Sequence, residues 1–117
     1  MKISVDNSAP LSPATLHILL ALAGGNLHGY GIIQEVKRQT EGRYRLGPGT
    51  LYDNLKKLMD SGVVADAPKS ASPPDDERHF YTLTSKGRDL LQAEASRLEN
   101  VVTEARLRLR ARRPGQV

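Results

Sequence analysis

The sequence predicts a mainly α-helical protein with a small β-hairpin, which is an α+β fold. Three observations predict it: three short helical patterns separated by glycine, two β-prone runs after them, and a long heptad pattern near the end. The chain of 117 residues, with 38% hydrophobic and 26% charged residues, has the size and composition of one globular domain. We therefore expect a single domain built mainly from helices.

Three helices are expected in the first half of the chain. The first begins at Pro13, with Ser12 as its N-cap, and ends at a glycine pair. The second covers residues 30–40 and has apolar residues on one side and polar residues on the other. The third begins at Pro48 and stops at Gly62. Its apolar residues recur at helical spacing, which predicts a buried stripe formed by Leu51, Leu55, Leu58 and Met59.

Two β-prone runs follow the third helix. Residues 63–67 and 79–83 are typical of antiparallel strands. The segment between them, residues 68–78, holds three prolines and three consecutive acidic residues, which predicts a long and mobile hairpin tip. The hairpin as a whole is expected over residues 63–83.

A long helix is expected at the end of the chain, over residues 85–113 with Thr84 as its cap. We expect a flexible arm over residues 1–9, a compact unit over 10–84 and a tail over 114–117. Apolar residues in the long helix step by 4, 3, 4, 3 and 4, the heptad spacing of helices that pair with other helices. This stripe consists of Leu91, Ala95, Leu98, Val102, Ala105 and Leu109.

The residue types exclude several classes of site. No cysteine is present, which excludes disulfides, thiolate zinc sites and a cysteine nucleophile. The histidines His17, His28 and His79 are scattered and form no HExxH motif, so we expect no catalysis, no metal and no cofactor. The sequence has no leader and no apolar run near the ~18 residues of a membrane span, so we expect a cytoplasmic protein without membrane contact.

The positive charge is concentrated near one end. The formal net charge is +4, but five of the 17 basic residues lie in the last dozen positions. The rest of the chain holds 12 basic and 13 acidic residues. Most of the chain is therefore close to neutral, and only the position of the charges can argue for nucleic acid. The arginines near the end are Arg106, Arg108, Arg110, Arg112 and Arg113.

This order of elements is the layout of a winged helix-turn-helix followed by a dimerisation helix. The third helix would leave Thr50, Asp53, Lys56 and Lys57 on its outer face, which suits the major groove of double-stranded DNA. The hairpin would form the wing, along the adjacent backbone or minor groove. The carboxylate of Asp53 would repel DNA phosphates unless it accepts a hydrogen bond from a cytosine amino group or pairs with a lysine.

Three segments, "HGYGIIQEV", "PGTLYDNLKKLMDSGVV" and "RHFYTLTSKGRDLL", resemble the PadR family of bacterial transcriptional regulators. The resemblance covers residues 16–91. The chain is similar to the short branch of the family, which has one C-terminal helix. It implies a dimeric winged-helix protein, usually a repressor, that leaves DNA when a small-molecule effector such as a phenolic acid or a drug-like compound binds. The arginine-rich end and the acidic wing tip lie outside the shared pattern.

The resemblance places Gly49, Thr50, Leu51 and Tyr52 at the front of the recognition helix. Tyr52 either packs under the helix or bonds to DNA, while Tyr30 opens the helix that crosses the DNA backbone and either packs or meets a phosphate. His28 is expected to cap that helix. The lysines of the third helix and the arginines of the preceding turn either contact DNA phosphates or are exposed to solvent without a partner. The expected DNA-binding residues are Tyr30, Arg43, Arg45, Gly49, Thr50, Tyr52, Lys56, Lys57, Lys69 and Arg78.

The heptad stripe allows two compatible interpretations: packing on the first helix of the same subunit, or pairing in a homodimer. A two-fold dimer would place its recognition helices about 34 Å apart and would bind a pseudo-palindromic operator. The rival function is a winged helix that contacts another protein, or an architectural module that binds DNA without sequence preference through its arginines.

The sequence leaves the effector, the operator, the regulated genes and the sign of regulation open. Some family members hold flat ligands between tryptophans, and this chain has no tryptophan, so that binding mode is excluded. A pocket around Leu16, Leu19 and Leu98, between the N-terminal and C-terminal helices, is the remaining expectation.

Overall fold

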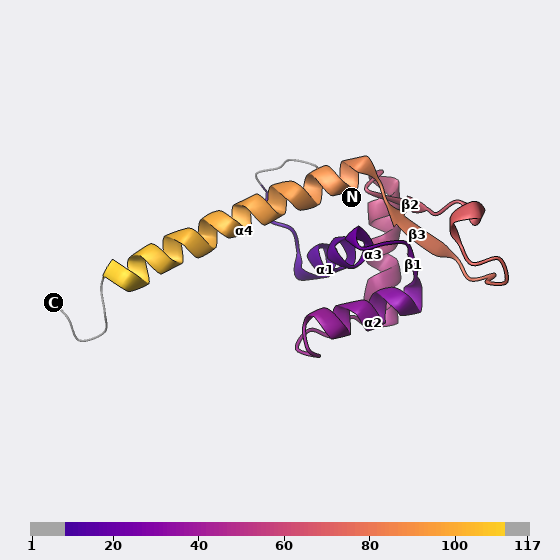
Figure 1. The fold of residues 1–117 in the computed structure, drawn as a ribbon, viewed down its shortest axis with the longest axis horizontal. Helices are drawn as coiled ribbons and strands as arrows, with labels where there is room; N and C mark the ends of the chain where they lie inside the picture. The colour runs from indigo at the N-terminus through magenta and orange to yellow at the C-terminus, as the bar shows by residue number, and fades with distance from the viewer. Residues whose placement is uncertain (1–8, 112–117) are drawn as a thin grey trace.

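The structure, a computed structural model, describes residues 9–111 and has four α-helices and a small three-stranded sheet. Three helices and the sheet form a body, and the fourth helix projects from it (Figure 1). This arrangement confirms the predicted α+β fold. The elements are α1 (Pro13–Ala23), β1 (Leu27–His28), α2 (Gly29–Gln39), α3 (Pro48–Asp60), β2 (Val64–Asp66), the 3-10 turn η1 (Lys69–Ala71), β3 (Phe80–Leu83) and α4 (Ser85–Ala111).

Helix α1 lies at the centre of the body and contacts α2, α3, α4 and β3. Its predicted start is confirmed: the backbone N–H of Thr15 donates to Ser12 Oγ at 3.2 Å, and Pro13 occupies the first turn. Ile18, Leu19 and Leu22 are at most 1% exposed, so this helix is the centre of the core.

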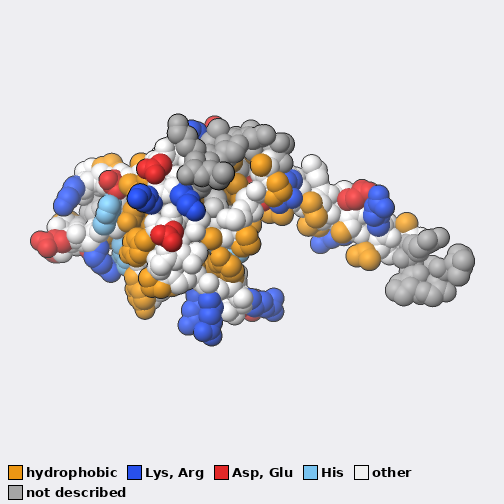
Figure 2. Space-filling model, turned by 180° about the vertical axis from the view of Figure 1, so that it is seen from behind, with side chains coloured by type: hydrophobic (Ala, Val, Ile, Leu, Met, Phe, Trp, Pro, Cys, Tyr) orange, Lys and Arg blue, Asp and Glu red, His pale blue; other side chains and the backbone are white. Residues whose placement is uncertain are grey.

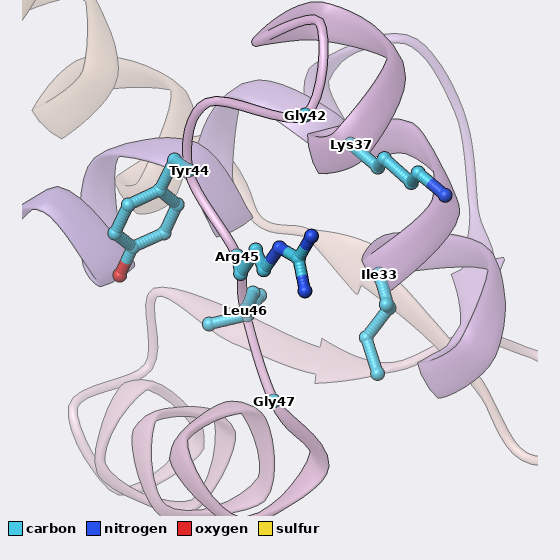
Figure 3. Close-up of a pocket in the computed structure, with 7 residues that line it drawn as sticks. All are labelled: Ile33, Lys37, Gly42, Tyr44, Arg45, Leu46 and Gly47. Atoms are coloured by element: carbon cyan, nitrogen blue, oxygen red, sulfur yellow. The ribbon is translucent and has the colours of Figure 1, made fainter.

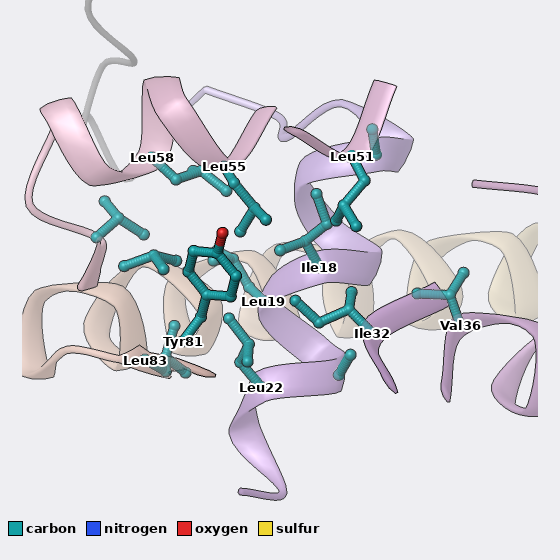
Figure 4. Packing of buried hydrophobic residues seen from close by; sticks show 14 of the residues in the cluster. Ile18, Leu19, Leu22, Ile32, Val36, Leu51, Leu55, Leu58, Tyr81 and Leu83 are labelled. Atoms are coloured by element: carbon teal, nitrogen blue, oxygen red, sulfur yellow. The ribbon is translucent and has the colours of Figure 1, made fainter. Parts of the chain in front are cut away.

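The core fills the space between α1, α2, α3 and the sheet (Figure 4). The predicted leucine stripe of α3 is confirmed, since Leu51, Leu55 and Leu58 are at most 2% exposed, and Met59 packs at its edge. Burial of each leucine contributes about 1.5–3 kcal/mol relative to exposure. The stripe therefore fixes which face of α3 remains available to a partner.

The sheet has one more strand than the sequence predicts. In the order β1-β3-β2, β3 is central; Leu27 of β1 faces Tyr81, and Val64 of β2 faces Leu83. The expected hairpin is thus the larger part of a three-stranded antiparallel sheet. Strand β1 gives no sequence signal, because it is two residues long and its partner strand begins 52 residues later, at Phe80.

The first turn of α4 is attached to the end of α3. Thr84 is its cap, because its Oγ1 accepts from the N–H of Gly87 at 3.0 Å, and the same hydroxyl lies 2.7 Å from the carbonyl oxygen of Gly62. Lys86 Nζ donates to the carbonyl oxygen of Ser61 at 2.8 Å. Gly87 leaves no room for a side chain, because a Cβ there would lie 2.3 Å from the Val63 carbonyl oxygen.

The two halves of α4 have different surroundings. Leu90 and Glu94 are buried against the body, whereas every described residue of the helix from 99 onward is exposed. Hydrophobic side chains lie along the projecting part (Figure 2). The expected arm up to residue 8, Arg112, Arg113 and the expected tail lie outside the described residues.

Candidate nucleic-acid interface

Helix α3 has two chemically distinct faces. Its leucines lie in the core, while Thr50, Tyr52, Asp53, Lys56 and Lys57 are all exposed on the outer side. Because the leucines recur at helical spacing on the buried side, the polar residues between them lie on the opposite, exposed side of the helix. This helix can therefore present hydroxyls and two ammonium groups to a partner without disturbing the core.

The front of α3 is open. Its N-cap is Gly47, which has no side chain to cap the helix, and Gly47, Pro48, Gly49 and Thr50 are exposed. No atom outside the adjoining chain lies within 4 Å of a Cβ built at Gly49. The first backbone N–H groups of a helix have no acceptor inside the helix, and they attract anions such as phosphate. The front of α3 thus offers free donors and space for close approach.

Tyr52 both packs and remains exposed. A Cβ built at Gly29, the first residue of α2, would lie 2.2 Å from the Tyr52 hydroxyl oxygen, so the ring lies directly against that glycine. The side chain nevertheless remains among the exposed large residues, at 51%. Tyr52 therefore holds α2 and α3 together and keeps part of its ring available. The role of Gly29 as the seat of this tyrosine was missed at the sequence level, although the "HGYG" motif contains it.

The start of α2 lies beside this contact. His28 Nδ1 accepts from the N–H of Gly31 at 3.0 Å, which confirms the predicted cap. Burial, and then the positive charge of Arg78, lower the pKa of His28, so the neutral form that can accept this bond is favoured. Tyr30, the next exposed residue, is 63% exposed and free to meet a phosphate.

Basic side chains gather on α2 and on the turn that leads to α3. Figure 2 shows lysine and arginine side chains at the lower edge of the body, where α2 lies in Figure 1. Lys37, Arg38, Arg43 and Arg45 are all exposed, and Arg38 pairs with Glu35 at 2.7 Å. Lys37 belongs to the polar side of the second predicted helix, and the fold brings it to the lining of the same cavity as Arg45 (Figure 3).

The wing presents less free positive charge than the sequence suggests. Arg78 Nε donates to Asp76 Oδ1 at 2.9 Å, and this ion pair lowers the pKa of Asp76 to about 2. His79 pairs with Asp66. Lys69, in η1, is exposed and has no carboxylate partner among the described residues. Of the two predicted wing donors, Lys69 is thus free, while Arg78 is held by a neighbour.

The heptad stripe of α4 is divided between two environments. Leu91, Ala95 and Leu98 are half-buried and line a groove with Leu16 and Leu20 of α1. Val102, Ala105 and Leu109 are exposed, and the exposed fraction of Leu109 is 73%. The sequence placed Leu19 in this groove, but Leu19 lies in the core because helical spacing puts Leu16 and Leu20 together on the outer face.

Comparison with known proteins gives consistent matches. The model of the family described as "Transcriptional regulator PadR-like family" matches residues 18–93. The Mycobacterium tuberculosis protein named "Transcriptional regulator Rv3488" is 33% identical over 89 residues, which cover 76% of this chain and 78% of that protein. An uncharacterized 37.1 kDa protein in a Streptomyces fradiae transposon is 38% identical over 82 residues. That match covers 70% of this chain but only 22% of the Streptomyces protein.

A solved structure extends these matches to the fold. Bacillus subtilis PadR in complex with operator DNA is similar with a TM-score of 0.59 and 28% identity, over 72% of this chain and 46% of that one. Within residues 9–111, no helix is long and apolar enough to cross a membrane. The matches confirm the expectation of a regulator in place of an enzyme. The chain belongs to the PadR-like family of transcriptional regulators.

Proposed function

We propose that this chain is a dimeric, sequence-specific repressor that binds double-stranded DNA at a pseudo-palindromic operator. The observation that carries the proposal is the division of α3: a leucine face buried in the core, and an outer face with two lysines behind an open helix start. A helix with this division can enter the major groove without loss of core packing. Thr50 and Tyr52 then meet bases or phosphates, and Lys56 and Lys57 meet phosphates.

Other exposed residues extend the proposed footprint. Tyr30, Arg43 and Arg45 lie on α2 and on the turn before α3, and each is exposed. The free Lys69 contributes from the wing, and Arg78 contributes only if it exchanges its bond to Asp76 for a phosphate. Gly49 allows the backbone to approach the DNA closely, because it has no side chain and the space that a Cβ would occupy there is open.

The proposed dimer uses the heptad stripe of α4. Exposed valine and leucine side chains on a projecting helix are unfavourable in water, and a second copy would cover them. Two copies related by a two-fold axis would present their α3 helices about 34 Å apart, one helical turn of DNA. Release by a small-molecule effector is part of the same proposal.

The test is selective capture of DNA. We would incubate the purified protein with fragmented DNA of its source organism at near-physiological salt and sequence the retained fragments. The expected result is a small set of promoters that share an inverted repeat, with half-sites separated by about 10 base pairs. A reporter placed behind such a promoter should be more active when the protein is absent.

A matched pair of variants connects the result to α3. Lys56→Gln with Lys57→Gln should weaken operator binding and reduce its salt dependence by about one ion per lysine. Arg110→Gln, an exposed change on α4, should leave the operator preference unchanged.

The second candidate function is sequence-independent DNA binding by the exposed arginines of α4. Arg106 and Arg110 have no ion-pair partner in the described part of the chain, whereas Arg108 pairs with Glu104. Diffuse capture that disappears as salt rises, and that Arg106→Gln with Arg110→Gln abolishes, would support this alternative and contradict operator recognition.

A further inference from the structure

Asn54 is a polar residue at the edge of the buried side of α3. It lies three residues after Leu51 and four residues before Leu58, and this spacing places it beside the leucine stripe. Its side chain is half-buried, whereas Leu51 and Leu55 are at most 2% exposed. Asn54 therefore lies between α3 and the core, and it is not one of the exposed residues that are proposed to meet DNA.

The side-chain amide of Asn54 joins two helices. Its Nδ2 donates to the carbonyl oxygen of Thr50, one turn earlier in α3, at 2.8 Å. Its Oδ1 accepts from Oγ1 of Thr15, which belongs to α1, at 3.4 Å. The two ends of one amide thus bond to different helices, and the amide links the front of α3 to α1.

Thr15 is a well-fixed anchor for this link. It is only 4% exposed, and its Oγ1 accepts from Oγ of Ser12, the N-cap of α1, at 3.1 Å. Ser12 thus donates to Thr15, and Thr15 donates to Asn54. Buried hydroxyl groups in folded proteins have hydrogen-bond partners, and Asn54 provides the acceptor that Thr15 needs.

The start of α1 is in turn held by α4. The backbone N–H of Leu11, the residue before Ser12, donates to Oε2 of Glu94 at 3.3 Å. Glu94 is 3% exposed, and Arg97 Nε donates to its Oε1 at 2.8 Å. The anchor of Asn54 is therefore fixed by α4 as well as by α1.

A hydrogen bond fixes the front of α3 in a way that leucine packing does not. Apolar contacts have no preferred direction, whereas a hydrogen bond weakens steeply when its angle changes. A single polar side chain in an otherwise apolar helix interface fixes the register of the two helices in coiled coils. Asn54 occupies the same kind of position between α1 and α3.

We propose that Asn54 is a positioning residue for DNA recognition, which fixes the front of α3 relative to α1 through its bond with Thr15. The proposal rests on the proposed DNA-binding function, because the placement of Thr50 matters only if the front of α3 meets DNA. Base edges are read by directional contacts, while long lysine side chains can still reach phosphates after a small displacement. Loss of the link therefore lowers the preference for the operator more than the general affinity for DNA.

The test removes the link at Thr15, which is buried and does not touch DNA. Thr15→Val has a similar size but lacks the hydroxyl, and Thr15→Ser retains it. The affinity of each variant is measured for the captured operator and for random-sequence DNA over a series of salt concentrations. Thr15→Val should reduce the ratio of the two affinities by about fivefold, the effect of one hydrogen bond, with an unchanged salt dependence. Thr15→Ser should keep the ratio of the wild-type chain.

A merely structural role of the hydroxyl predicts a different result. If Thr15→Val only lowered the folded fraction, the affinities for operator and random DNA would fall together, and an unchanged ratio overturns the proposal. Ser61→Ala is the matched control, because the Ser61 hydroxyl donates to the carbonyl oxygen of Lys57 at 2.9 Å, the same kind of bond at the far end of α3. Its ratio should equal that of the wild-type chain. Circular dichroism verifies that each variant is folded.

A double-variant cycle tests whether the two residues act through one bond. Asn54→Ala should reduce the ratio at least as much as Thr15→Val does. The combination of both changes should add little to Asn54→Ala alone, because the link is already broken. If the two losses add, Asn54 and Thr15 do not act through a shared bond and the proposal is wrong.

A measurement without DNA separates failure of this proposal from failure of the proposed function. Hydrogen exchange of the Tyr52 and Asp53 amides, near the front of α3, should be faster in Thr15→Val by about fivefold relative to the Leu58 amide. Equal changes at all three amides refute the link whether or not an operator exists. Faster exchange at the front in a chain that captures no operator refutes the DNA-binding function, and with it the role in recognition, while the link itself stands.

Discussion

Helices α3 and α4 both have an apolar stripe and a charged outer face, but only α3 completes its burial within the chain. The leucines of α3 are at most 2% exposed, whereas Val102 and Leu109 of α4 are 47% and 73% exposed. The difference arises from position: α3 packs against α1, α2 and β2, while α4 extends beyond the body (Figure 1). An apolar stripe thus predicts that the helix packs against another surface, but it does not indicate whether that surface belongs to the same chain or to another one.

The largest effect expected from this comparison is on folding. Leu55→Ala should lower the free energy of unfolding by about 2–5 kcal/mol, because it leaves a cavity in the core. Leu109→Ala, at low protein concentration in urea denaturation, should change it by less than about 0.5 kcal/mol. Equal losses for both variants would show that the end of α4 is already buried at that concentration.

The second effect concerns the partner of α4. Leu98→Asp with Val102→Asp should raise the dissociation constant of the dimer by about 100-fold or more, which corresponds to about 2.8 kcal/mol. Sedimentation equilibrium measures this, with Asn100→Asp, which adds one negative charge on another side of the same helix, as a control. A dimer that tolerates both aspartates would have to use a different surface.

The third effect concerns the first turn of α4, where the helix is attached to the body. Gly87→Ala should destabilise the fold by about 1–3 kcal/mol, because its Cβ would meet the backbone oxygen of Val63. The control Gly49→Ala has open space around its Cβ and should be neutral or stabilising in thermal unfolding. Rescue of Gly87→Ala by Leu83→Ala would mean that a side chain, and not the backbone oxygen, sets the limit.

The smallest effect depends on pH and comes from the buried Glu94. Hydrogen bonds from Arg97 lower the pKa of Glu94, and its Oε2 also accepts from the N–H of Leu11 at 3.3 Å. A carboxyl whose pKa is lower in the folded state stabilises the fold above its unfolded pKa of about 4.3. That contribution is lost as the pH falls through the lower, folded pKa.

Glu94→Gln should therefore cost on the order of 1 kcal/mol at pH 7 and flatten the stability profile below about pH 5. Chemical denaturation at a series of pH values measures this. Arg97→Gln should produce a similar flattening, and the double variant should add little, because both residues belong to one ion pair. Additive losses would argue that the two side chains act separately.

Local signals predicted most of the helices. Ser12, Thr84 and Gly62 mark helix ends through hydrogen bonds or backbone angles that depend on nearby residues only, and the structure confirms each of them. The leucine stripe of α3 was predictable for the same reason, because its spacing follows from helical geometry. These elements needed no knowledge of the rest of the fold.

Features that depend on distant residues were not predictable. Strand β1 is two residues long and exists because β3 lies beside it. The contact between Gly29 and Tyr52, and the shared cavity of Lys37 and Arg45, arise only when α2 and α3 are packed. The ion pair between Arg78 and Asp76 likewise occupies a side chain that was predicted to contact DNA, and residue type alone does not indicate this pair.

The bonds of Thr84 and Lys86 to the end of α3 make α4 a lever. Its fulcrum lies where those side chains bond to Gly62 and Ser61, and its 27 residues give it a length of about 40 Å. A lever of this length multiplies motion: a tilt at the fulcrum displaces the far end several times further than the near end. A force that tilts α4 must therefore move the end of α3 with it, or break these bonds together with the packing of Leu90 and Glu94 against the body.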